Sequence, residues 1–478
     1  MKDVEVIAPG SFEPVRHYYT RVLNATIHPM VKSFLSLGPD RLATRFCHLN
    51  PRVDRDALEE ILYYEPKFLR WAGADLFSVT TAAGLRRMVV IETNSCPSGQ
   101  KSMPLFSDHE EDGGYGTLIS EAFAPLLRAS KIKDGELAVV YDKNYMENSG
   151  YAAAMADHFQ CDVLLAPFYN SDNDPPVKYD DGVMYVRKPS GEWTPIKAAF
   201  RYVTQKPWNR IPIYSKTALL NPVVACIAGG RNKMVAAMAY EIFNAQYGGS
   251  GLTIHIPETV RDVQKEEIPF VVQKFGGHAV IKIPYSNAGQ GVFIVTDSNQ
   301  LEEFMARDYP YNCFIVQSLI GNYEWSSDGT VGKFYHVGTV PNKRNELYVA
   351  DLRMMVYRGE QSFRPIAVYG RRARTPLRND LNGDTAPWDM LGTNLSIKTG
   401  TDSWDTESSR LIMMDRKDFN SLGIGLDDLI MGYVQTVMAV CAVDKMACSL
   451  FTSKGKFRTK AFMSLNDDPP LLEELRVE

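Results

Sequence analysis

The chain has 478 residues, of which 45% are hydrophobic and 23% are charged, and its formal net charge is −5. These values are ordinary for globular proteins and exclude a disordered chain, a collagen-like repeat and a coiled coil. Acidic and basic residues are interleaved along the whole length, without the basic stripe that neutralises a phosphate backbone, so we expect no nucleic-acid partner. The length is sufficient for roughly two to four domains with their own cores.

Features that report on the cellular compartment indicate a cytoplasmic protein. The N-terminal segment has no apolar signal region, and no uninterrupted apolar stretch reaches the roughly 18 residues typical of a membrane span. The seven cysteines are scattered without CxxC pairs. This spacing favours reduced thiols over a disulfide framework or a zinc site. We therefore expect no membrane partner.

Taken in chain order, the patterns predict a mixed α/β and α+β protein. Residues 1–70 carry apolar positions at helical spacing and form a predicted helical N-terminal segment. The runs ADLFSVTT and RRMVVIETN follow, separated by a short turn at residues 82–84, and predict a hairpin within a unit of residues 71–115. Alternating short apolar strands and helices over residues 116–225 predict a small parallel α/β domain.

The second half of the chain is predicted to contain a larger unit, residues 226–400. It begins with a helix over residues 228–244 and continues with the strands HAVIKIPYS, GVFIVTD and NCFIVQSLI. Two later strands, YVADLRMMVYR and SFRPIAVYG, belong to the same unit. Residues 401–478 are predicted to form a helical C-terminal segment, and the chain contains no internal repeat.

The first candidate site is Lys282 on an apolar strand, followed by a glycine-containing loop and a second strand. The loop residues considered for ligand binding are Ser286, Asn287, Gly289, Gln290 and Gly291. Glycine allows the backbone to approach a ligand closely and to present N–H groups to phosphate oxygens, while the lysine supplies positive charge. The pattern indicates a nucleotide clamp, and a hairpin turn with an exposed lysine fits the loop alone equally well.

The second candidate site consists of Asp75, Glu92 and Asn94 across the predicted hairpin. Glu92 and Asn94 are two residues apart on one strand, so their side chains point to the same face. Mg²⁺ prefers hard oxygen ligands and is commonly shared between protein carboxylates and nucleotide phosphates. A lone Glu-x-Asn is more often a solvated strand end, but an aspartate on the partner strand favours a magnesium site.

The third candidate site follows the apolar run at residues 313–316, where Gln317 leads out of a strand and Glu324 lies seven residues further on. The edge of such a strand can offer backbone groups to adenine, and a nearby carboxylate can accept hydrogen bonds from ribose hydroxyls. Taken alone, this pattern also fits an ordinary structural strand.

Two further residues have competing interpretations. Arg201 lies at a predicted strand end, where its guanidinium can bind a substrate carboxylate as a fork, and an ion pair fits the position equally well. Cys96 lies beside the magnesium segment, but no histidine is near it in the sequence. A packed thiol is therefore favoured over a catalytic nucleophile.

Together these residues resemble the ATP-grasp superfamily, and more narrowly its circularly permuted branch, which includes glutathionylspermidine-synthetase-like and other peptide-forming ligases. In ordinary members the lysine strand and glycine loop come first, and the magnesium segment lies near the C-terminus. Here the order is reversed, because Asp75 and the segment from Glu92 to Gly99 precede Lys282. The resemblance covers roughly residues 70–375. It implies an ATP-grasp fold in circularly permuted order, with residues 116–225 as the pre-ATP-grasp domain.

The resemblance also implies a role for each matching residue. Lys233 and Lys282 correspond to the two ATP lysines and, with Arg353, to the catalytic charges. The residues that match the adenine hinge are Gln317, Ser318 and Leu319, and Glu324 has the spacing of the ribose carboxylate. The residues assigned to the substrate are Ser98, Gly99, Arg201 and Arg372. Ordinary members often carry an arginine two residues before the magnesium aspartate, where this chain has Gly73, and Arg353 is the candidate replacement.

The implied activity is the ATP- and Mg²⁺-dependent ligation of a carboxylate to an amine through an acyl phosphate. The implied partners are small acids and amines such as amino acids, peptides or polyamines, and a homodimer is compatible with the sequence. Two alternatives stay open, a small-molecule kinase on the same fold and a non-catalytic nucleotide-binding protein. Whether the nucleophile is an amine or a thiol is also open.

Overall fold

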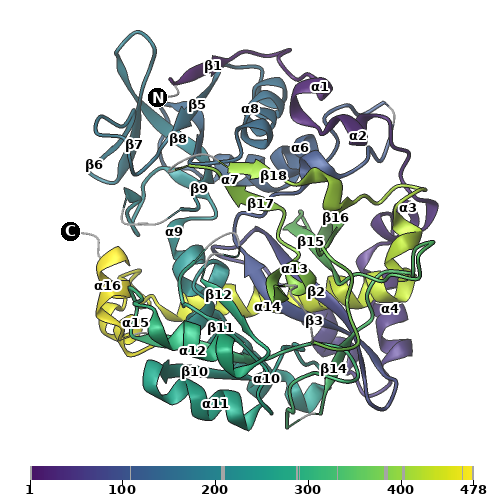
Figure 1. Ribbon diagram of the computed structural model, residues 1–478. Helices are drawn as coiled ribbons and strands as arrows, with labels where there is room; N and C mark the ends of the chain where they lie inside the picture. The colour runs from purple at the N-terminus through teal and green to yellow at the C-terminus, as the bar shows by residue number, and fades with distance from the viewer. Residues whose placement is uncertain are drawn as a thin grey trace.

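The computed structural model describes residues 3–107, 109–205, 210–286, 289, 291–330, 332–381, 386–400, 404–465 and 467–475. In these parts of the chain the strands form three larger sheets and one two-stranded ribbon, with helices around them (Figure 1). The mixed α/β class expected from the sequence is confirmed. The permuted order and the domain boundaries stay predictions.

The first sheet has the strand order β1-β5-β4-β8-β7-β6, and β9 also pairs with β8. The strands are β1 (Glu5–Ile7), β4 (Glu136–Tyr141), β5 (Val163–Pro167), β6 (Val177–Asp180), β7 (Val183–Arg187), β8 (Trp193–Tyr202) and β9 (Ala218–Leu220). The pairs β4–β5, β4–β8 and β8–β9 are parallel, as expected, whereas β1, β6 and β7 pair antiparallel, so the sheet is mixed. The helix α8 (Tyr145–Phe159) packs against β4 and β5.

The second sheet is antiparallel, with the order β10-β13-β11-β12. Its strands are β10 (Thr259–Gln264), β11 (Ala279–Lys282), β12 (Val292–Val295) and β13 (Cys313–Ser318). The helices α11 (Ile268–Lys274) and α12 (Ser298–Ala306) cover it, and a small apolar core that includes Phe304 and Phe314 fills the space between them. This sheet carries the lysine strand and the predicted adenine hinge.

The third sheet unites early and late parts of the chain. Its order is β14-β2-β15-β16-β19, with β3 paired to β2. The strands are β2 (Trp71–Thr81), β3 (Arg86–Asn94), β14 (Phe334–His336), β15 (Ala350–Arg358), β16 (Phe363–Arg372) and β19 (Leu411–Ile412). The predicted hairpin is confirmed by the β2–β3 pairing. Because β15 pairs with the other edge of β2, Asp75 lies opposite Glu92 on one side and opposite Arg353 on the other.

The remaining helices and a two-stranded ribbon complete the described structure. The helices are α1 (Pro14–His17), α2 (Thr20–Leu23), α3 (Pro29–Leu35), α4 (Pro39–Leu49), α5 (Arg55–Leu62), α6 (Gly113–Leu118), α7 (Ala124–Arg128), α9 (Val223–Ala225), α10 (Lys233–Tyr247), α13 (Pro387–Leu391), α14 (Leu426–Ser449), α15 (Thr459–Leu465) and α16 (Pro469–Leu475). The strands β17 (Ser396–Lys398) and β18 (Trp404–Thr406) form the ribbon.

Three expected boundaries differ from the structure. The N-terminal segment is helical from α1 to α5, but it also contributes β1 to the first sheet. The helix expected over residues 228–244 begins only at Lys233, because Gly229 has a φ of 138° and Asn232 caps the helix by accepting hydrogen bonds from the N–H groups of Met234 and Val235. The segment 401–478 is helical from α14 onward, but β18 and β19 precede that helix.

The helix α14 forms the centre of the main core. It packs against β2, β3, β15 and α10, and Figure 1 shows it crossing the molecule behind the third sheet. The helix has 24 residues, and the mean hydropathy of its most apolar 18-residue window is 1.4, which is long and apolar enough to cross a membrane, but 78% of that window is buried inside the protein. Because strands and helices bury α14 on several sides, it is a core helix of this fold.

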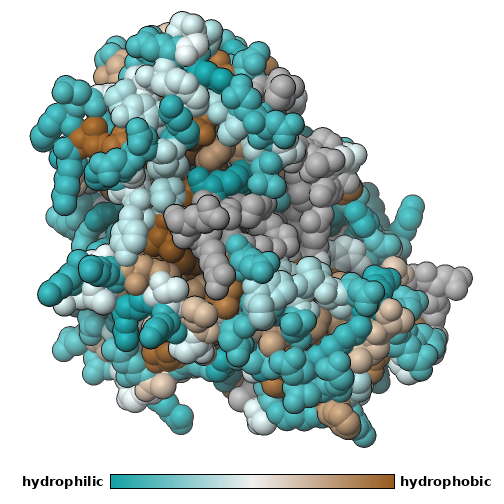
Figure 2. Space-filling view, turned by 90° about the vertical axis from the view of Figure 1, so that its left-hand side faces the viewer, coloured by the Kyte–Doolittle hydropathy of each residue, from teal (hydrophilic) through white to brown (hydrophobic). Residues whose placement is uncertain are grey.

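Figure 2 shows one face of the molecule, on which hydrophilic side chains cover an upper and a lower part. Hydrophobic side chains are visible in a hollow between these two parts. A surface of this kind is typical of a protein that binds ligands between two lobes.

Candidate active site

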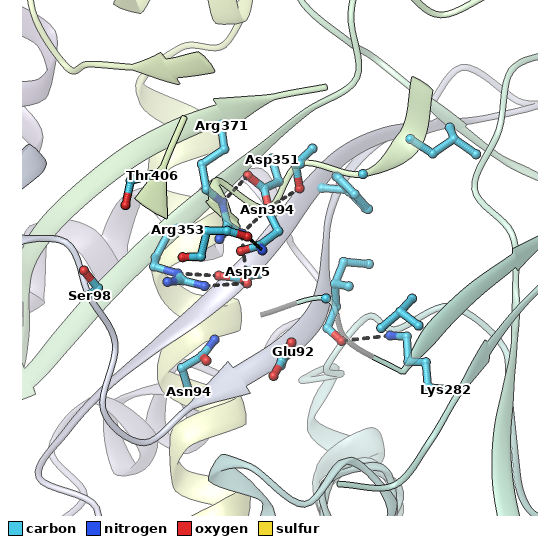
Figure 3. Close-up of a pocket in the computed structure, with 18 of the residues that line it drawn as sticks. Asp75, Glu92, Asn94, Ser98, Lys282, Asp351, Arg353, Arg371, Asn394 and Thr406 are labelled. Carbon is cyan, nitrogen blue, oxygen red and sulfur yellow. Dashed lines mark hydrogen bonds and ion pairs between the residues drawn. The ribbon is translucent and has the colours of Figure 1, made fainter. Parts of the chain in front are cut away.

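A cavity of about 670 Å³ is lined by residues from all three sheets. Of the predicted site residues, those on its wall are Asp75, Glu92, Asn94, Ser98, Lys233, Lys282, Gly289, Gln317, Ser318, Leu319 and Arg353. The three candidate sites of the sequence therefore meet in one place, although the chain separates them by up to about 240 positions. Figure 3 shows Asp75, Glu92, Asn94, Lys282 and Arg353 converging from different strands.

One end of the cavity combines an apolar wall with two lysines. The apolar wall includes Phe77, Ile91, Val280, Ile294 and Leu319. Lys282 ends β11 and is 6% exposed, and its Nζ lies 3.5 Å from the carbonyl oxygen of Ile91. Burial lowers the pKa of Lys282 to about 8, against the opposing effect of the Glu92 carboxylate. A flat apolar base and an anionic group fit this combination of surfaces.

The second lysine, Lys233, lies at the first position of α10. Its Nζ donates a hydrogen bond to the carbonyl oxygen of Ser286 at 2.8 Å and lies 3.7 Å from Oε1 of Glu92. Lys233 thus links the glycine loop to the magnesium segment. Both amino groups are within reach of one anionic ligand between them.

The glycine loop has the backbone conformation that its sequence predicts. Gly289 and Gly291 have φ values of 76° and 73°, which lie in the left-handed region. A Cβ atom at Gly289 would lie 2.7 Å from the ring of Trp388. Gly289 lines the cavity, whereas Ser286 and Gly291 are not on its wall. Asn287 and Gln290 lie outside the described residues.

Four charged side chains form a network in the middle of the cavity (Figure 3). Nε and Nη2 of Arg353 donate to the two carboxylate oxygens of Asp75 at 2.6 and 2.8 Å. Nη2 of Arg371 lies 2.9 Å from Oδ2 of Asp75 and also bonds Asp351. Burial by itself would raise the pKa of Asp75, but Arg353 and Arg371 outweigh it and hold that pKa well below its usual value. The network fixes two guanidinium groups at the cavity wall.

Glu92 and Asn94 are the residues that fit a magnesium ion best. Oδ1 of Asn94 accepts a hydrogen bond from Nη1 of Arg231 at 2.9 Å, and its Nδ2 has no partner in the described parts of the chain. A carboxylate and an amide oxygen beside phosphate groups are an ordinary Mg²⁺ environment. Both oxygens of Asp75 already bind guanidinium groups, so Asp75 ligates a metal only if these contacts open. The described residues contain no cluster of three or more His, Cys, Asp or Glu side chains suited to a metal.

The other end of the cavity is lined by Ser98 and by residues around the start of α8. The carboxylate of Glu147, which is fully buried, accepts hydrogen bonds from Ser98 Oγ at 2.5 Å and from the Gly99 and Gln100 N–H groups at 2.8 Å each. Gly99 itself is not on the cavity wall. Its role is to pack closely, since a Cβ there would lie 2.3 Å from the sulfur of Met355.

Three further predicted binding residues also lie off the cavity wall. Arg201 is 1% exposed, and its guanidinium donates to the carbonyl oxygens of Asn221 and Val203 at 2.5 and 2.6 Å. Its hydrogen-bonding capacity is used inside the protein, so the substrate-fork interpretation is wrong. Glu324 is exposed and lies off the cavity wall, because the chain turns away after β13.

Arg372 is the third of these residues, and its neighbour Arg371 lines the cavity instead. Side chains alternate along a strand, so Arg371 faces Asp351 while Arg372 lies on the other face, 4.7 Å from the centre of the Tyr348 ring. The residues of the cavity wall that the sequence did not single out include Lys101, Lys143, Arg231, Asp351 and Arg371. The two-residue period of β16 is a signal that could have favoured Arg371.

Cys96 lies on the cavity wall with a fully buried thiol. Burial raises the pKa of this thiol to about 11. A protonated thiol is a weak nucleophile, which agrees with the interpretation of Cys96 as a packed residue.

No protein-family model matches the chain, and no curated protein sequence matches it significantly. Among solved structures, a glutathione synthetase-like effector from Globodera pallida is similar at 7% identity and a TM-score of 0.41, over 73% of this chain and 86% of that chain. A RimK-domain ATP-grasp protein from Sphaerobacter thermophilus has 13% identity and a TM-score of 0.28, over 49% and 90% of the two chains. A carboxyaminoimidazole ribonucleotide synthase from Aspergillus clavatus, complexed with ATP, has 11% identity and a TM-score of 0.25, over 49% and 69%. All three TM-scores are below 0.5, so the functional inference rests on the residues of the cavity.

Proposed function

We propose that this protein is an ATP- and Mg²⁺-dependent ligase that joins a carboxylic acid to an amine, with ATP-grasp machinery in circularly permuted order. The observation that carries the proposal is the meeting of Lys233, Lys282, Glu92 and Asn94 on the wall of one cavity, beside an apolar surface. A buried lysine, Lys282, and a half-buried one, Lys233, opposite hard oxygen ligands are suited to nucleotide phosphates and a divalent cation.

In this proposal the apolar wall and the segment from Gln317 to Leu319 hold the base, and the two lysines hold the phosphates. Glu92 and Asn94 would hold Mg²⁺, which would supply further positive charge to the phosphates. Arg353, fixed by Asp75, supports the charge that develops when the substrate carboxylate attacks the γ-phosphate. The products of that step are an acyl phosphate and ADP, and the amine then displaces phosphate.

In the proposed reaction the cavity also holds the reacting groups in position and keeps water away from them. The three sheets enclose the reacting groups, and fixed side chains replace water around them. The thiol of Cys96 has no part in the proposed reaction. The proposed partners are small acids and amines, and the proposed location is the cytoplasm.

The test is a product analysis with purified protein, ATP, Mg²⁺ and pooled amino acids, polyamines and small peptides. We expect substrate-dependent ADP and a product lighter than its two parts by one water. Lys282→Ala and Glu92→Ala are each expected to reduce the rate by about 100-fold or more, because each removes charge stabilisation at the phosphates. The exposed Lys454, outside the cavity, is the matched control, and Lys454→Ala should retain the wild-type rate.

The same measurement separates the alternatives. A stable phosphomonoester without condensation would identify a kinase instead of a ligase. ATP binding without turnover across the whole panel would favour the non-catalytic nucleotide-binding protein.

A further inference from the structure

The apolar end of the cavity is formed by side chains from two sheets. Phe77 belongs to the third sheet, and Val280 and Ile294 belong to the second. Gln317 lies opposite Val280 in the second sheet, so the chain that follows β13 passes along this wall as far as Ile320. A flat base between the two sheets would meet this part of the chain at its edge.

The N–H groups of three residues at this edge are already used within the protein. The N–H of Ser318 donates to a neighbouring backbone carbonyl at 2.8 Å. Those of Leu319 and Gly321 donate to the hydroxyl oxygens of Ser327 and Ser326, at 2.6 and 2.9 Å. Because each N–H group is a single donor, these three cannot also bind a base. Recognition of the base therefore needs other groups on the wall.

His336 lines the cavity and has an unused ring nitrogen. It pairs with Val79 on β2, so its side chain lies on the same face as Phe77, and the two ring centres are 4.5 Å apart. The residue is 9% exposed, and its Nδ1 has no hydrogen-bond partner in the described parts of the chain. A buried polar atom without a partner is unfavourable, and a ligand that supplies the partner removes this cost.

The unused nitrogen of His336 is a hydrogen-bond acceptor. Burial lowers the pKa of the ring to about 3, against the effect of a hydrogen bond to the backbone of Ile320, so the ring is neutral. The carbonyl oxygen of Ile320 accepts the ring proton, which leaves the lone pair on Nδ1. A ligand that binds Nδ1 must therefore offer a donor.

The purine bases differ in what they offer at position 6. Adenine carries an amino group there, which is a donor, whereas guanine carries a carbonyl oxygen, which is an acceptor. Hypoxanthine, the base of ITP, has the same carbonyl oxygen. A fixed acceptor on the protein thus binds adenine and repels the other two bases.

We infer that Nδ1 of His336 accepts a hydrogen bond from the 6-amino group of adenine and thereby selects ATP over nucleotides with a carbonyl group at that position. This inference rests on the proposed function and deepens it, because it names the residue that specifies the nucleotide. The base lies between Phe77 on one side and Val280 and Ile294 on the other, with its amino group towards β14.

The test is a cycle of two nucleotides and two proteins, measured by calorimetry with Mg²⁺ and without acid or amine. ATP is compared with purine riboside triphosphate, which lacks only the 6-amino group. The wild type should bind ATP about tenfold more tightly, because Nδ1 is already removed from water and gains one hydrogen bond. His336→Phe keeps a ring beside Phe77 and should reduce this ratio to below about threefold. The cycle cancels any effect of the substitution that is common to both nucleotides.

ITP and a second histidine extend the test. ITP should bind the wild type about 30-fold or more weakly than ATP, because two acceptors meet at position 6, and His336→Phe should narrow this difference to below about tenfold. His109 is exposed and lies outside the cavity, so His109→Phe is the matched control and should keep all wild-type ratios. Circular dichroism checks that each variant is folded.

Two results overturn the inference. A wild-type preference for ATP over purine riboside triphosphate of less than about threefold does so without any variant, so the test holds even if His336→Phe does not fold. Survival of the full preference in folded His336→Phe does so as well, including the case in which both nucleotides bind more weakly by the same factor.

The two proposals fail separately in this design. If the preference for ATP depends on His336 and the product analysis finds no condensation, only the ligase function is refuted. If condensation occurs and the preference is absent, only the role of His336 is refuted. If no nucleotide binds, both proposals are refuted.

Discussion

At the scale of single residues, the position of Asp75 carries the most information about the site. The sequence predicts a magnesium ligand there, whereas the structure surrounds this carboxylate with Arg353 and Arg371. The two roles have different effects on the stability of the protein when no metal is bound. Without a bound cation, a carboxylate that serves only as a metal ligand has no counter-charge and destabilises the folded protein. A carboxylate held between two guanidinium groups already has its counter-charges and stabilises the folded protein.

Asp75→Asn separates these roles by stability. If the arginine contacts dominate, the variant should lose about 3 kcal/mol or more of unfolding free energy, because the guanidinium of Arg353 loses its carboxylate partner and that of Arg371 keeps only Asp351. Urea unfolding in the presence of EDTA measures this loss. Glu92→Gln is the comparison, since the Glu92 side chain is 26% exposed and its ion pair with Lys233 is 3.7 Å long, so a change below about 1 kcal/mol is expected. Equal effects of the two substitutions would contradict the arginine-anchor interpretation.

At the scale of elements, α14 shows how a buried carboxylate can order a neighbouring segment. Asp444 is fully buried on this helix, and its oxygens accept hydrogen bonds from the N–H groups of Phe68 and Leu69 at 2.7 and 2.8 Å. They also accept from the Lys67 N–H at 3.0 Å and the Tyr64 hydroxyl at 2.8 Å. This segment leads directly into β2, so α14 helps to set the start of the strand that carries Asp75.

Asp444→Asn is therefore expected to destabilise the protein by about 2–4 kcal/mol. The amide keeps one acceptor oxygen, but its NH₂ group faces donors, which leaves buried N–H groups without a partner. Thermal and urea unfolding measure the loss, and hydrogen exchange at residues 67–69 should quicken. Asp427→Asn is the control on the same helix, because the Asp427 side chain is 42% exposed and should matter by less than about 1 kcal/mol. Unchanged exchange at residues 67–69 would show that Asp444 does not hold this segment.

The elements also show what could be predicted from the sequence. The β2–β3 hairpin, with Asp75 on the partner strand of Glu92 and Asn94, follows from two adjacent strands and a short turn, and this prediction is confirmed. The choice of Arg372 over Arg371 was wrong, because the face of a strand depends on its register with distant partners. The prediction that Glu324 lies at the site was wrong for a related reason. The number of residues after a strand does not determine where the chain turns.

The pairing of strands that lie far apart in the chain could not be predicted from local sequence patterns. The pairing of β15 with β2 joins residues separated by about 280 positions, and apolar periodicity contains no information on such a pairing. Lys101 and Lys143 have ordinary sequence surroundings, and only the folded structure shows that both line the cavity. Sequence motifs could identify the residues proposed to bind the nucleotide, whereas these other wall residues emerge only from the fold.

At the scale of the whole molecule, buried histidines link stability to pH. His17 is 3% exposed and His336 is 9% exposed, and the Nδ1 atom of each has no partner in the described parts of the chain. Burial, aided by Arg16, lowers the pKa of His17 to about 4, and burial lowers that of His336 to about 3. Both rings are thus neutral in the folded protein at pH 5, whereas in the unfolded chain they take up protons below about pH 6.5.

The sign of the effect follows from proton uptake. Between about pH 6.5 and pH 4 the unfolded chain binds more protons, so stability is fully present above pH 6.5 and falls as the pH drops, by about 1.4 kcal/mol per pH unit for each histidine. Urea unfolding from pH 7.5 to 4.5 measures this slope. His17→Phe keeps a ring beside Phe12, whose centre lies 4.7 Å away, and should reduce the slope by the contribution of one proton. The exposed His109 supplies the control, since His109→Gln should leave the slope unchanged. An unaltered slope in His17→Phe would mean that the buried ring is protonated in the folded protein after all.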